Sequence, residues 1–92
     1  MNKAQYTEVT KGTSVADQDL YAGIESSRIA NARPKRPWMQ YSLYTKSDCN
    51  IKINGSSDEI PVYADVPFSG QANIIGMILV ESGVEYSLVV EY

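Results

Sequence analysis

The sequence predicts a small all-β domain, an antiparallel β-sandwich or barrel-like fold, preceded by an extended N-terminal arm. From Trp38 onward, apolar and polar residues alternate with a period of two, which is typical of half-buried strands. The alternating segments are short and recur at about ten-residue spacing between turn-forming residues. This spacing favours a sandwich or barrel over a βαβ fold, so we assign residues 38–92 to the β domain and residues 1–37 to the arm.

Within the predicted domain, four segments place apolar side chains at alternate positions: residues 39–43, 49–53, 60–64 and 84–90. The connector Asn54–Asp58 has the composition of a hairpin loop. Pro61 and Pro67 indicate that their segment lies at the edge of a sheet, because proline has no N–H group to donate to the hydrogen-bond ladder of a central strand.

The stretch 72–80 is apolar on both faces around Gly76. A strand of this kind needs cover on both sides, which one small sheet does not provide. We expect the arm or a neighbouring subunit to supply the second cover. The turn 81–83 then predicts a hairpin between this stretch and residues 84–90.

The N-terminal region, residues 1–37, is polar, and its apolar residues are too sparse for a continuous core face. Residues 5–9 alternate weakly like a strand, and residues 14–17 resemble a capping box before a short helical turn that Gly23 would end. Residues 28–37 carry four positive charges and two prolines. They are predicted to form an extended basic linker, because proline is excluded from helix interiors and central strands.

The residue types argue against catalysis. The 92-residue chain has no histidine and a single cysteine, Cys49. A Ser-His or Cys-His nucleophile is therefore excluded, as are a disulfide within the chain and a Cys/His metal centre. Asp58 and Glu59 are the nearest carboxylate pair, but neighbouring residues of a strand point to opposite faces. We expect that the protein is not an enzyme and that it has neither a catalytic residue nor a cofactor.

A calcium site is conceivable from the hard oxygen donors near one end of the predicted sheet, which are Asp48, Asn50, Asp58, Glu59 and Asp65. Their spacing matches no known calcium loop. Turn-forming and solubilising roles explain the same residues, so no metal ligand is assigned.

Charge divides unevenly along the chain. Residues 1–46 hold seven Lys/Arg against four Asp/Glu, whereas residues 47–92 hold one lysine against seven acids. Chance is one explanation. The other is that the basic half of one copy lies on an acidic protein surface, with Arg33, Lys35 and Arg36 as contacts. The net charge of −3 argues against nucleic acid as a partner.

Aromatic residues give a further indication of binding. Tyr44 and Tyr63 fall on faces opposite the predicted core, and Trp38 lies at the junction with the arm. Val66 and Phe68 lie in a proline-flanked loop. Large side chains outside a core are favoured at protein interfaces, although surface decoration or a sugar-stacking platform of Trp38, Tyr44 and Tyr63 would also explain them.

Three stretches carry a family resemblance. They read Cys-Asn-Ile-Lys-Ile-Asn-Gly from Cys49, Ile-Pro-Val-Tyr-Ala-Asp-Val-Pro-Phe from Ile60 and Ile-Leu-Val-Glu-Ser-Gly-Val-Glu-Tyr from Ile78. Together they resemble the small β-sandwich proteins of tailed bacteriophage particles over about half of the chain. The resemblance covers residues after position 48 and none of the arm.

This resemblance implies a structural virion component, an auxiliary or decoration protein that binds and stabilises the capsid lattice. Its partners would be the major capsid protein or other virion proteins, and it would occur in multiple copies in virions assembled in the host bacterial cytoplasm. A tail, neck or baseplate adaptor is one alternative, and a glycan-binding module for host attachment is another. No apolar run is long enough for a signal peptide or a membrane span, so no membrane partner is expected.

Overall fold

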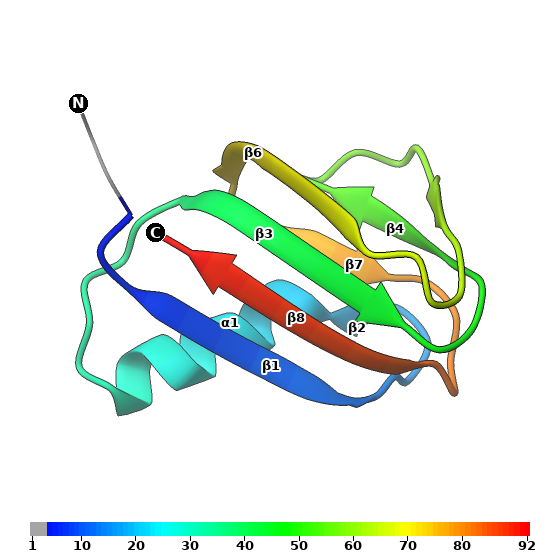
Figure 1. The fold of residues 1–92 in the computed structure, drawn as a ribbon, viewed down its shortest axis with the longest axis horizontal. Helices are drawn as coiled ribbons and strands as arrows, with labels where there is room; N and C mark the ends of the chain where they lie inside the picture. Colours follow the sequence, from blue (N-terminus) through cyan, green and yellow to red (C-terminus); the bar gives the residue numbers. More distant parts are fainter. Residues whose placement is uncertain (1–3) are drawn as a thin grey trace.

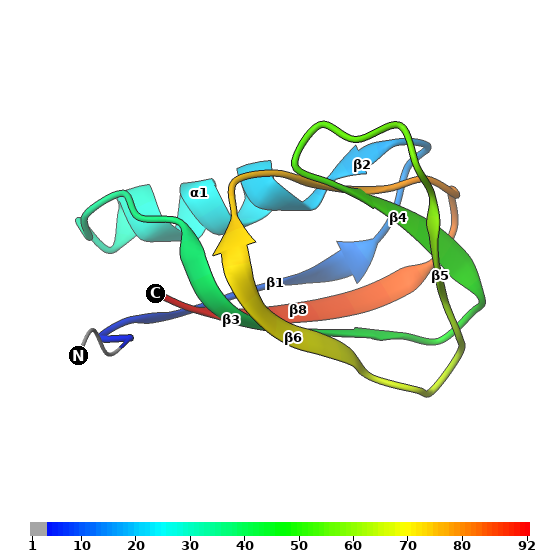
Figure 2. The ribbon, with the colours of Figure 1, turned by 90° about the horizontal axis from the view of Figure 1, so that it is seen from above.

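Two antiparallel four-stranded sheets pack against each other in a computed structural model that describes residues 4–92, apart from the side chain of Ala72 (Figure 1, Figure 2). The large sheet has the order β1-β8-β3-β6, formed by Thr7–Thr13, Glu85–Glu91, Trp38–Thr45 and Phe68–Ile74. The small sheet has the order β2-β7-β4-β5, formed by Gln18–Asp19, Met77–Leu79, Cys49–Ile53 and Ile60–Val62. The predicted antiparallel sandwich is confirmed.

The strands of the small sheet are too short to cover the large sheet, and helix α1 (Leu20–Ala30) completes the second layer. Figure 2 shows α1 in the layer of β2, β7 and β4, facing the large sheet. Leu20 and Ile24 lie one helical turn apart and are both buried. The core therefore lies between the large sheet on one side and the small sheet with α1 on the other.

The N-terminal segment is part of this fold, so the prediction of an extended arm is wrong from Thr7 onward. β1 pairs with β8 along its whole length, from Thr7 opposite Glu91 to Thr13 opposite Glu85. The weak alternation of residues 5–9 does mark a strand. Its partner lies at the other end of the chain, and its outer face is polar because it meets solvent. These two properties made β1 look like an arm.

The helix begins later and is longer than predicted. Asp19 is the N-cap, and its carboxylate accepts a hydrogen bond from the Ala22 N–H at 3.0 Å. Gly23 lies inside α1, where a Cβ atom would be 2.5 Å from the Thr10 hydroxyl oxygen. Gly23 thus lets the helix approach β1 closely. Ser14, the predicted cap, is buried and accepts a hydrogen bond from the Val84 N–H at 3.0 Å.

The basic segment 28–37 is only partly a linker. Residues 28–30 form the last turn of α1, and residues 31–37 connect the helix to β3. Asn31 closes the helix, with its N–H donating to the Ser27 carbonyl at 3.0 Å. The two prolines both follow the helix, which is why the charged residues before them could remain helical.

The apolar stretch 72–80 is divided between both sheets, contrary to the prediction of a single strand. β6 ends at Ile74, and β7 begins at Met77. Figure 2 shows the end of β6 turning out of the large sheet toward the other layer. Ile74 and Met77 are both buried, while Ile75 between them is 62% exposed. The change of layer places these apolar residues around one core.

Asn54 holds this corner. Its side-chain oxygen accepts hydrogen bonds from the N–H groups of Ile75 at 2.8 Å and Gly76 at 3.2 Å. Its own N–H donates to the Gly76 carbonyl at 2.9 Å. Asn54 and Gly55 have positive φ angles of 54° and 76°, as an Asn-Gly hairpin turn requires. The predicted turn is therefore confirmed, and it also supports the neighbouring corner.

The predicted hairpin between residues 72–80 and 84–90 is wrong. β7 pairs with β2 and β4, whereas β8 pairs with β1 and β3 in the other sheet. The turn 81–83 therefore crosses between layers. The predicted hairpin of β4 and β5 is confirmed, with Asn50 opposite Pro61, and β5 lies at the sheet edge as the proline indicated.

Candidate protein-binding surface

Three exposed apolar or aromatic side chains lie on and beside the loop of residues 63–67, which connects β5 to β6. Tyr63 is 58% exposed and Val66 56% exposed, and Tyr44 near the end of β3 is 37% exposed. We call these three residues the loop patch. Each of them was a predicted contact, and the fold leaves all three accessible.

Hydrogen bonds hold the loop in place. The Val66 N–H donates to the Tyr63 carbonyl at 3.2 Å, which closes a turn in which Asp65 has a φ of 60°. The Asp65 N–H donates to the Thr45 carbonyl at 2.9 Å, and the Tyr44 hydroxyl donates to the Asp65 carboxylate. This last hydrogen bond raises the pKa of Tyr44, so its hydroxyl stays protonated at neutral pH. The loop patch is thus fixed before any partner binds.

Phe68 follows the loop patch but points partly into the core. Its ring packs against Tyr41, with the two ring centroids 5.8 Å apart. Both residues are half-buried against the hydrophobic core. Phe68 therefore supports the loop from the side of the core. Of the two residues predicted in this loop, Val66 is the one that is open to a partner.

Trp38 was predicted as a contact at the arm junction, and this prediction is wrong. Its side chain is only 2% exposed, and it stacks on Tyr21 of α1 with ring centroids 5.4 Å apart. Helix α1, of which the sequence predicted only a short turn, covers it. The sugar-stacking platform of Trp38 with Tyr44 and Tyr63 is consequently not formed.

The predicted basic contacts lie far from the loop patch. Arg33, Lys35 and Arg36 precede β3, whereas Tyr44 lies near the end of β3. Figure 1 shows these two ends of β3 on opposite sides of the molecule. The Arg33 and Arg36 guanidinium groups each lie 5.4 Å from the ring centroid of Tyr6. Lys35 lies 3.8 Å from the Glu25 carboxylate, with 69% of its side chain exposed. The structure does not bring these residues to the loop patch, and their charges already have partners within the chain.

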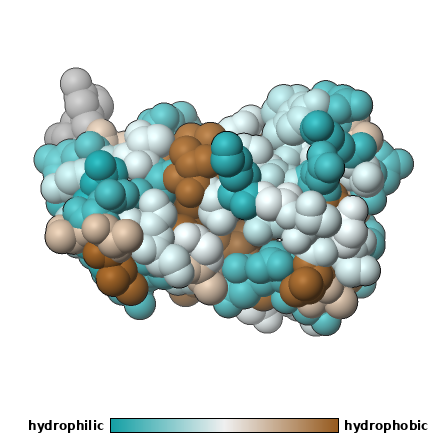
Figure 3. Space-filling model, turned by 90° about the horizontal axis from the view of Figure 1, so that it is seen from below, coloured by the Kyte–Doolittle hydropathy of each residue, from teal (hydrophilic) through white to brown (hydrophobic). Residues whose placement is uncertain are grey.

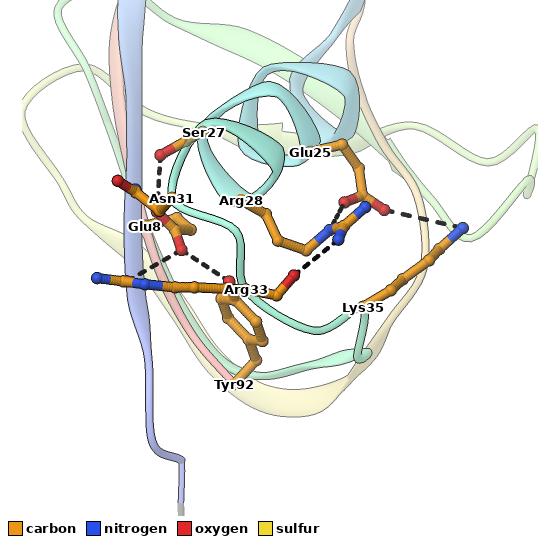
Figure 4. Close-up of polar contacts among 8 residues, drawn as sticks. All are labelled: Glu8, Glu25, Ser27, Arg28, Asn31, Arg33, Lys35 and Tyr92. Atoms are coloured by element: carbon orange, nitrogen blue, oxygen red, sulfur yellow. Dashed lines mark hydrogen bonds and ion pairs between the residues drawn. The ribbon is translucent and has the colours of Figure 1, made fainter.

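A buried carboxylate, missed in the sequence, organises this basic end (Figure 4). Glu8 is 2% exposed. It accepts hydrogen bonds from the Ser27 hydroxyl at 2.7 Å, the Asn31 amide at 3.0 Å, the Arg33 guanidinium at 3.0 Å and the Tyr92 hydroxyl at 2.7 Å. A charged residue in a polar segment is ordinarily solvated, so no local signal pointed to its burial.

The electrostatics of Glu8 indicate a structural role. Burial alone would raise the pKa of Glu8, but the hydrogen bonds from Ser27, Tyr92 and Asn31 and the charge of Arg33 outweigh it and lower this pKa. Burial and the bond to Glu8 raise the pKa of Tyr92 to about 12. Both groups keep one protonation state near neutral pH, whereas a general acid or base works best with a pKa near that pH.

Three of the five oxygen donors considered for calcium, Asp48, Asn50 and Asp65, take other partners. Asp48 accepts a hydrogen bond from the Ala64 N–H at 2.8 Å, and the Asn50 amide donates to Glu81 at 2.8 Å. Asp65 is engaged by Tyr44. Within residues 4–92, no group of three or more His, Cys, Asp or Glu side chains is arranged to hold a metal ion.

Other exposed apolar side chains are scattered. They belong to different elements: β1, the segment after it, α1 and the corner between β6 and β7. Their exposed fractions are 48% for Val9, 64% for Val15, 65% for Ile29 and 62% for Ile75. Figure 3 shows the molecule from the side of β1, where apolar surface forms separate spots divided by hydrophilic surface. Isolated exposed apolar residues are normal in folded proteins, so they define no second patch.

Comparisons with protein-family models, with curated proteins and with solved structures give no significant match. In the part of the chain that the structure describes, no helix has the length and apolar character needed to cross a bilayer.

Proposed function

We propose that this protein is a structural component of a larger protein assembly and that it joins the assembly through the loop patch. The observation that carries the proposal is that Tyr44, Tyr63 and Val66 are exposed on a loop that is already held by hydrogen bonds. Aromatic side chains contribute large contact areas to interfaces. A fixed loop loses little conformational entropy on binding, so more of the contact energy remains as affinity.

The assembly we propose is a tailed bacteriophage particle, in which the chain acts as an auxiliary or decoration protein on the capsid. The resemblance that begins at Cys49 supports this choice. The three resembling stretches contribute to β4, β5, β6, β7 and β8, and the second of them contains Tyr63 and Val66 of the loop patch. A protein that binds only the assembled lattice stabilises it by mass action, and many copies on the major capsid protein would add their effects.

The proposal is tested with particles of the virus that encodes the chain, prepared without it. Purified chain is mixed with these particles, and bound chain is measured after sedimentation. Val66→Ser should weaken binding about tenfold, the effect of losing about 1.4 kcal/mol at an interface centre. Tyr63→Ser should have at least the same effect. Ile29→Ser is the matched control, because Ile29 is 65% exposed and belongs to the last turn of α1, whose end Figure 1 shows on the side of the molecule opposite the end of β3. This variant should bind as the unmodified chain does.

Stoichiometric co-sedimentation that Val66→Ser weakens and Ile29→Ser leaves unchanged would support the proposal. Equal binding by all variants would show that the loop patch is not the contact. Absence of the chain from native particles and from the reconstituted pellet would exclude the virion role altogether.

A further inference from the structure

β6 is the one edge strand of the described fold that is both long and free of charge. The other edges carry recognised protection against pairing. β5 has three residues and contains Pro61, and β2 has two residues including Asp19. β1 carries Lys11 on its outer face, and Arg33 donates a hydrogen bond to the Thr7 carbonyl at its beginning. β6 has seven residues, Phe-Ser-Gly-Gln-Ala-Asn-Ile, without a charge or a proline.

The hydrogen-bonding phase of the large sheet shows which backbone groups of β6 face outward. The Lys46 N–H donates to the Glu85 carbonyl, so even-numbered residues of β3 face β8 and odd-numbered residues face β6. Tyr41 lies opposite Gly70 in this ladder. Ser69 and Gln71, which alternate with Gly70, therefore direct their N–H and C=O groups away from β3 to the open edge. Figure 2 shows β6 at the margin of its layer with no further strand outside it.

The edge is irregular only at one end. The register with β3 shifts between Trp38 and Gln40, so the bulge lies toward Ile74 and leaves Phe68–Gln71 regularly paired. Tyr41 lies across Gly70, where a Cβ atom would come within 2.9 Å of the tyrosine hydroxyl. An aromatic ring from the neighbouring strand thus covers the edge glycine and supports the strand.

We propose that β6 pairs antiparallel with β6 of a second copy of this chain about a twofold axis. The two large sheets would then join into one continuous sheet. In a twofold antiparallel pair, residue i of one strand faces residue j of the other and j faces i, so a charge near the axis lies close to its own copy and is repelled by it. A neutral edge avoids this repulsion. Ser69 and Gln71 each direct one N–H donor and one C=O acceptor outward. An identical antiparallel strand presents the same groups at every second residue, so the two strands can pair.

The surface beside the edge is also suited to a second copy. A shallow hollow of about 370 Å³ lies on the outer face of β6, β3 and β8. Its lining includes Gln40, Ser42, Ser69 and Gln71 on the two strands nearest the edge, and Glu91 on β8. Amide and hydroxyl groups act as both donors and acceptors. The four polar residues nearest the edge can therefore form hydrogen bonds with the same residues of a second copy.

The inference goes beyond the proposed function, since pairing at β6 does not require the loop patch to bind a capsid protein. The regular part of the edge is short, so the interface would be at the small end of specific interfaces. We expect a dimer that dissociates at concentrations on the order of 10–100 μM. Crowding of copies on a particle would raise the local concentration and favour the pairing.

The first test is sedimentation equilibrium of the full chain between about 10 μM and about 500 μM, a range that brackets the expected dissociation constant. Gln71→Lys places a charge on the edge, whereas Gln40→Lys places it directly opposite, on the inner strand β3 and on the same face. We expect the first variant to remain monomeric and the second to dimerise. Ser69→Lys and Ser42→Lys form a second matched pair, which keeps the test usable if one edge variant fails to fold.

Amide hydrogen exchange then locates the interface. In a monomer the Ser69 and Gln71 N–H groups face solvent and exchange quickly, so their protection should rise with protein concentration. A chain that stays monomeric over the whole range would overturn the inference, as would equal dimerisation of the two variants in a pair or protection that changes elsewhere instead. Growth beyond the dimer would overturn it as well, because it would indicate that β6 pairs with a different edge. Particle binding that Val66→Ser weakens is a separate result, so the two proposals can fail independently.

Discussion

The Glu8→Gln substitution tests whether one buried carboxylate joins β1, α1 and the end of β8. Four donors converge on the two oxygens of Glu8. Glutamine keeps the shape but offers a single oxygen, and its NH₂ group faces the remaining donors. Hydrogen bonds to a charged group contribute about 1.5–3 kcal/mol each, and a buried donor left without a partner costs about 1–3 kcal/mol.

The contribution of Arg33 must be discounted, because a third of its side chain is exposed and solvent screens the pair. We therefore expect Glu8→Gln to lower the free energy of unfolding by about 2–4 kcal/mol at neutral pH. Tyr92→Phe removes one hydrogen-bond donor and leaves the Glu8 carboxylate with three. It should therefore lower the free energy of unfolding by less, about 1–2 kcal/mol.

The pH dependence gives an independent check. The pKa of Glu8 in the folded protein lies below its ordinary value. A group with a lowered folded pKa stabilises the protein above its unfolded pKa, about 4.3 for glutamate, and this stabilisation is lost as the pH falls through the folded pKa. The free energy of unfolding should therefore fall below about pH 4 more steeply in the unmodified chain than in Glu8→Gln.

Urea unfolding, followed by circular dichroism from neutral pH to about pH 3, measures both effects. Glu85→Gln is the matched control, because Glu85 forms an ion pair with Lys46 but its side chain is 59% exposed. This control should cost no more than about 0.5 kcal/mol. If the two substitutions cost the same, or if the acid slope of Glu8→Gln equals that of the unmodified chain, the carboxylate does not have the role assigned to it.

Three further substitutions or deletions test the packing. Gly23→Ala should gain about 1 kcal/mol of helix propensity but lose more through the clash with Thr10, so urea unfolding should show a net loss of about 1–3 kcal/mol. Thr10→Ala should recover part of this loss, and a stabilised Gly23→Ala variant would contradict the close approach. Asn54→Ala should lower the free energy of unfolding by about 1–3 kcal/mol, because the N–H groups at the corner between β6 and β7 lose their acceptor; an unchanged melting curve would show that the corner does not depend on it. A chain beginning at Trp38 lacks β1, β2 and α1 and should show no cooperative unfolding by circular dichroism, whereas a folded fragment would restore the idea of a dispensable arm.

Much of the sheet structure could be predicted because its signal is local. A strand with one buried face alternates with a period of two, and β3, β4, β5 and β8 all carry this pattern. The Asn54-Gly55 turn and the edge position of Pro61 also follow from local backbone chemistry. The antiparallel sandwich could be inferred from these elements alone.

The remaining elements depend on distant partners. β1 is polar, and its pairing with β8 joins the two ends of the chain. α1 buries few residues, and Gly23 resembled a helix end because its packing role depends on Thr10 of another strand. The apolar run 72–80 has no local signal for the change of layer at Ile75, which Asn54 stabilises from a different turn.

The candidate site shows the same division. Tyr44 and Tyr63 were found because alternation placed them opposite the core, and Val66 was found because prolines flank its loop. Trp38 was assigned to the surface because nothing in its own segment reveals that Tyr21 would cover it. Glu8 was not considered, since its donors come from α1, the linker and the end of the chain.

The folded N-terminal segment changes how an assembly role can work. Of the basic side chains that were expected to meet an acidic neighbour, Arg33 pairs with Glu8, Lys35 lies near Glu25, and Arg36 lies over the Tyr6 ring. Our proposal therefore assigns binding to rigid surfaces and not to a flexible charged arm. The loop patch and β6 are consecutive in the chain and provide two such surfaces, one with exposed side chains and one with exposed backbone. A partner at the loop patch and a second copy at β6 would use different chemistry, which is why Val66→Ser and Gln71→Lys should separate the two contacts.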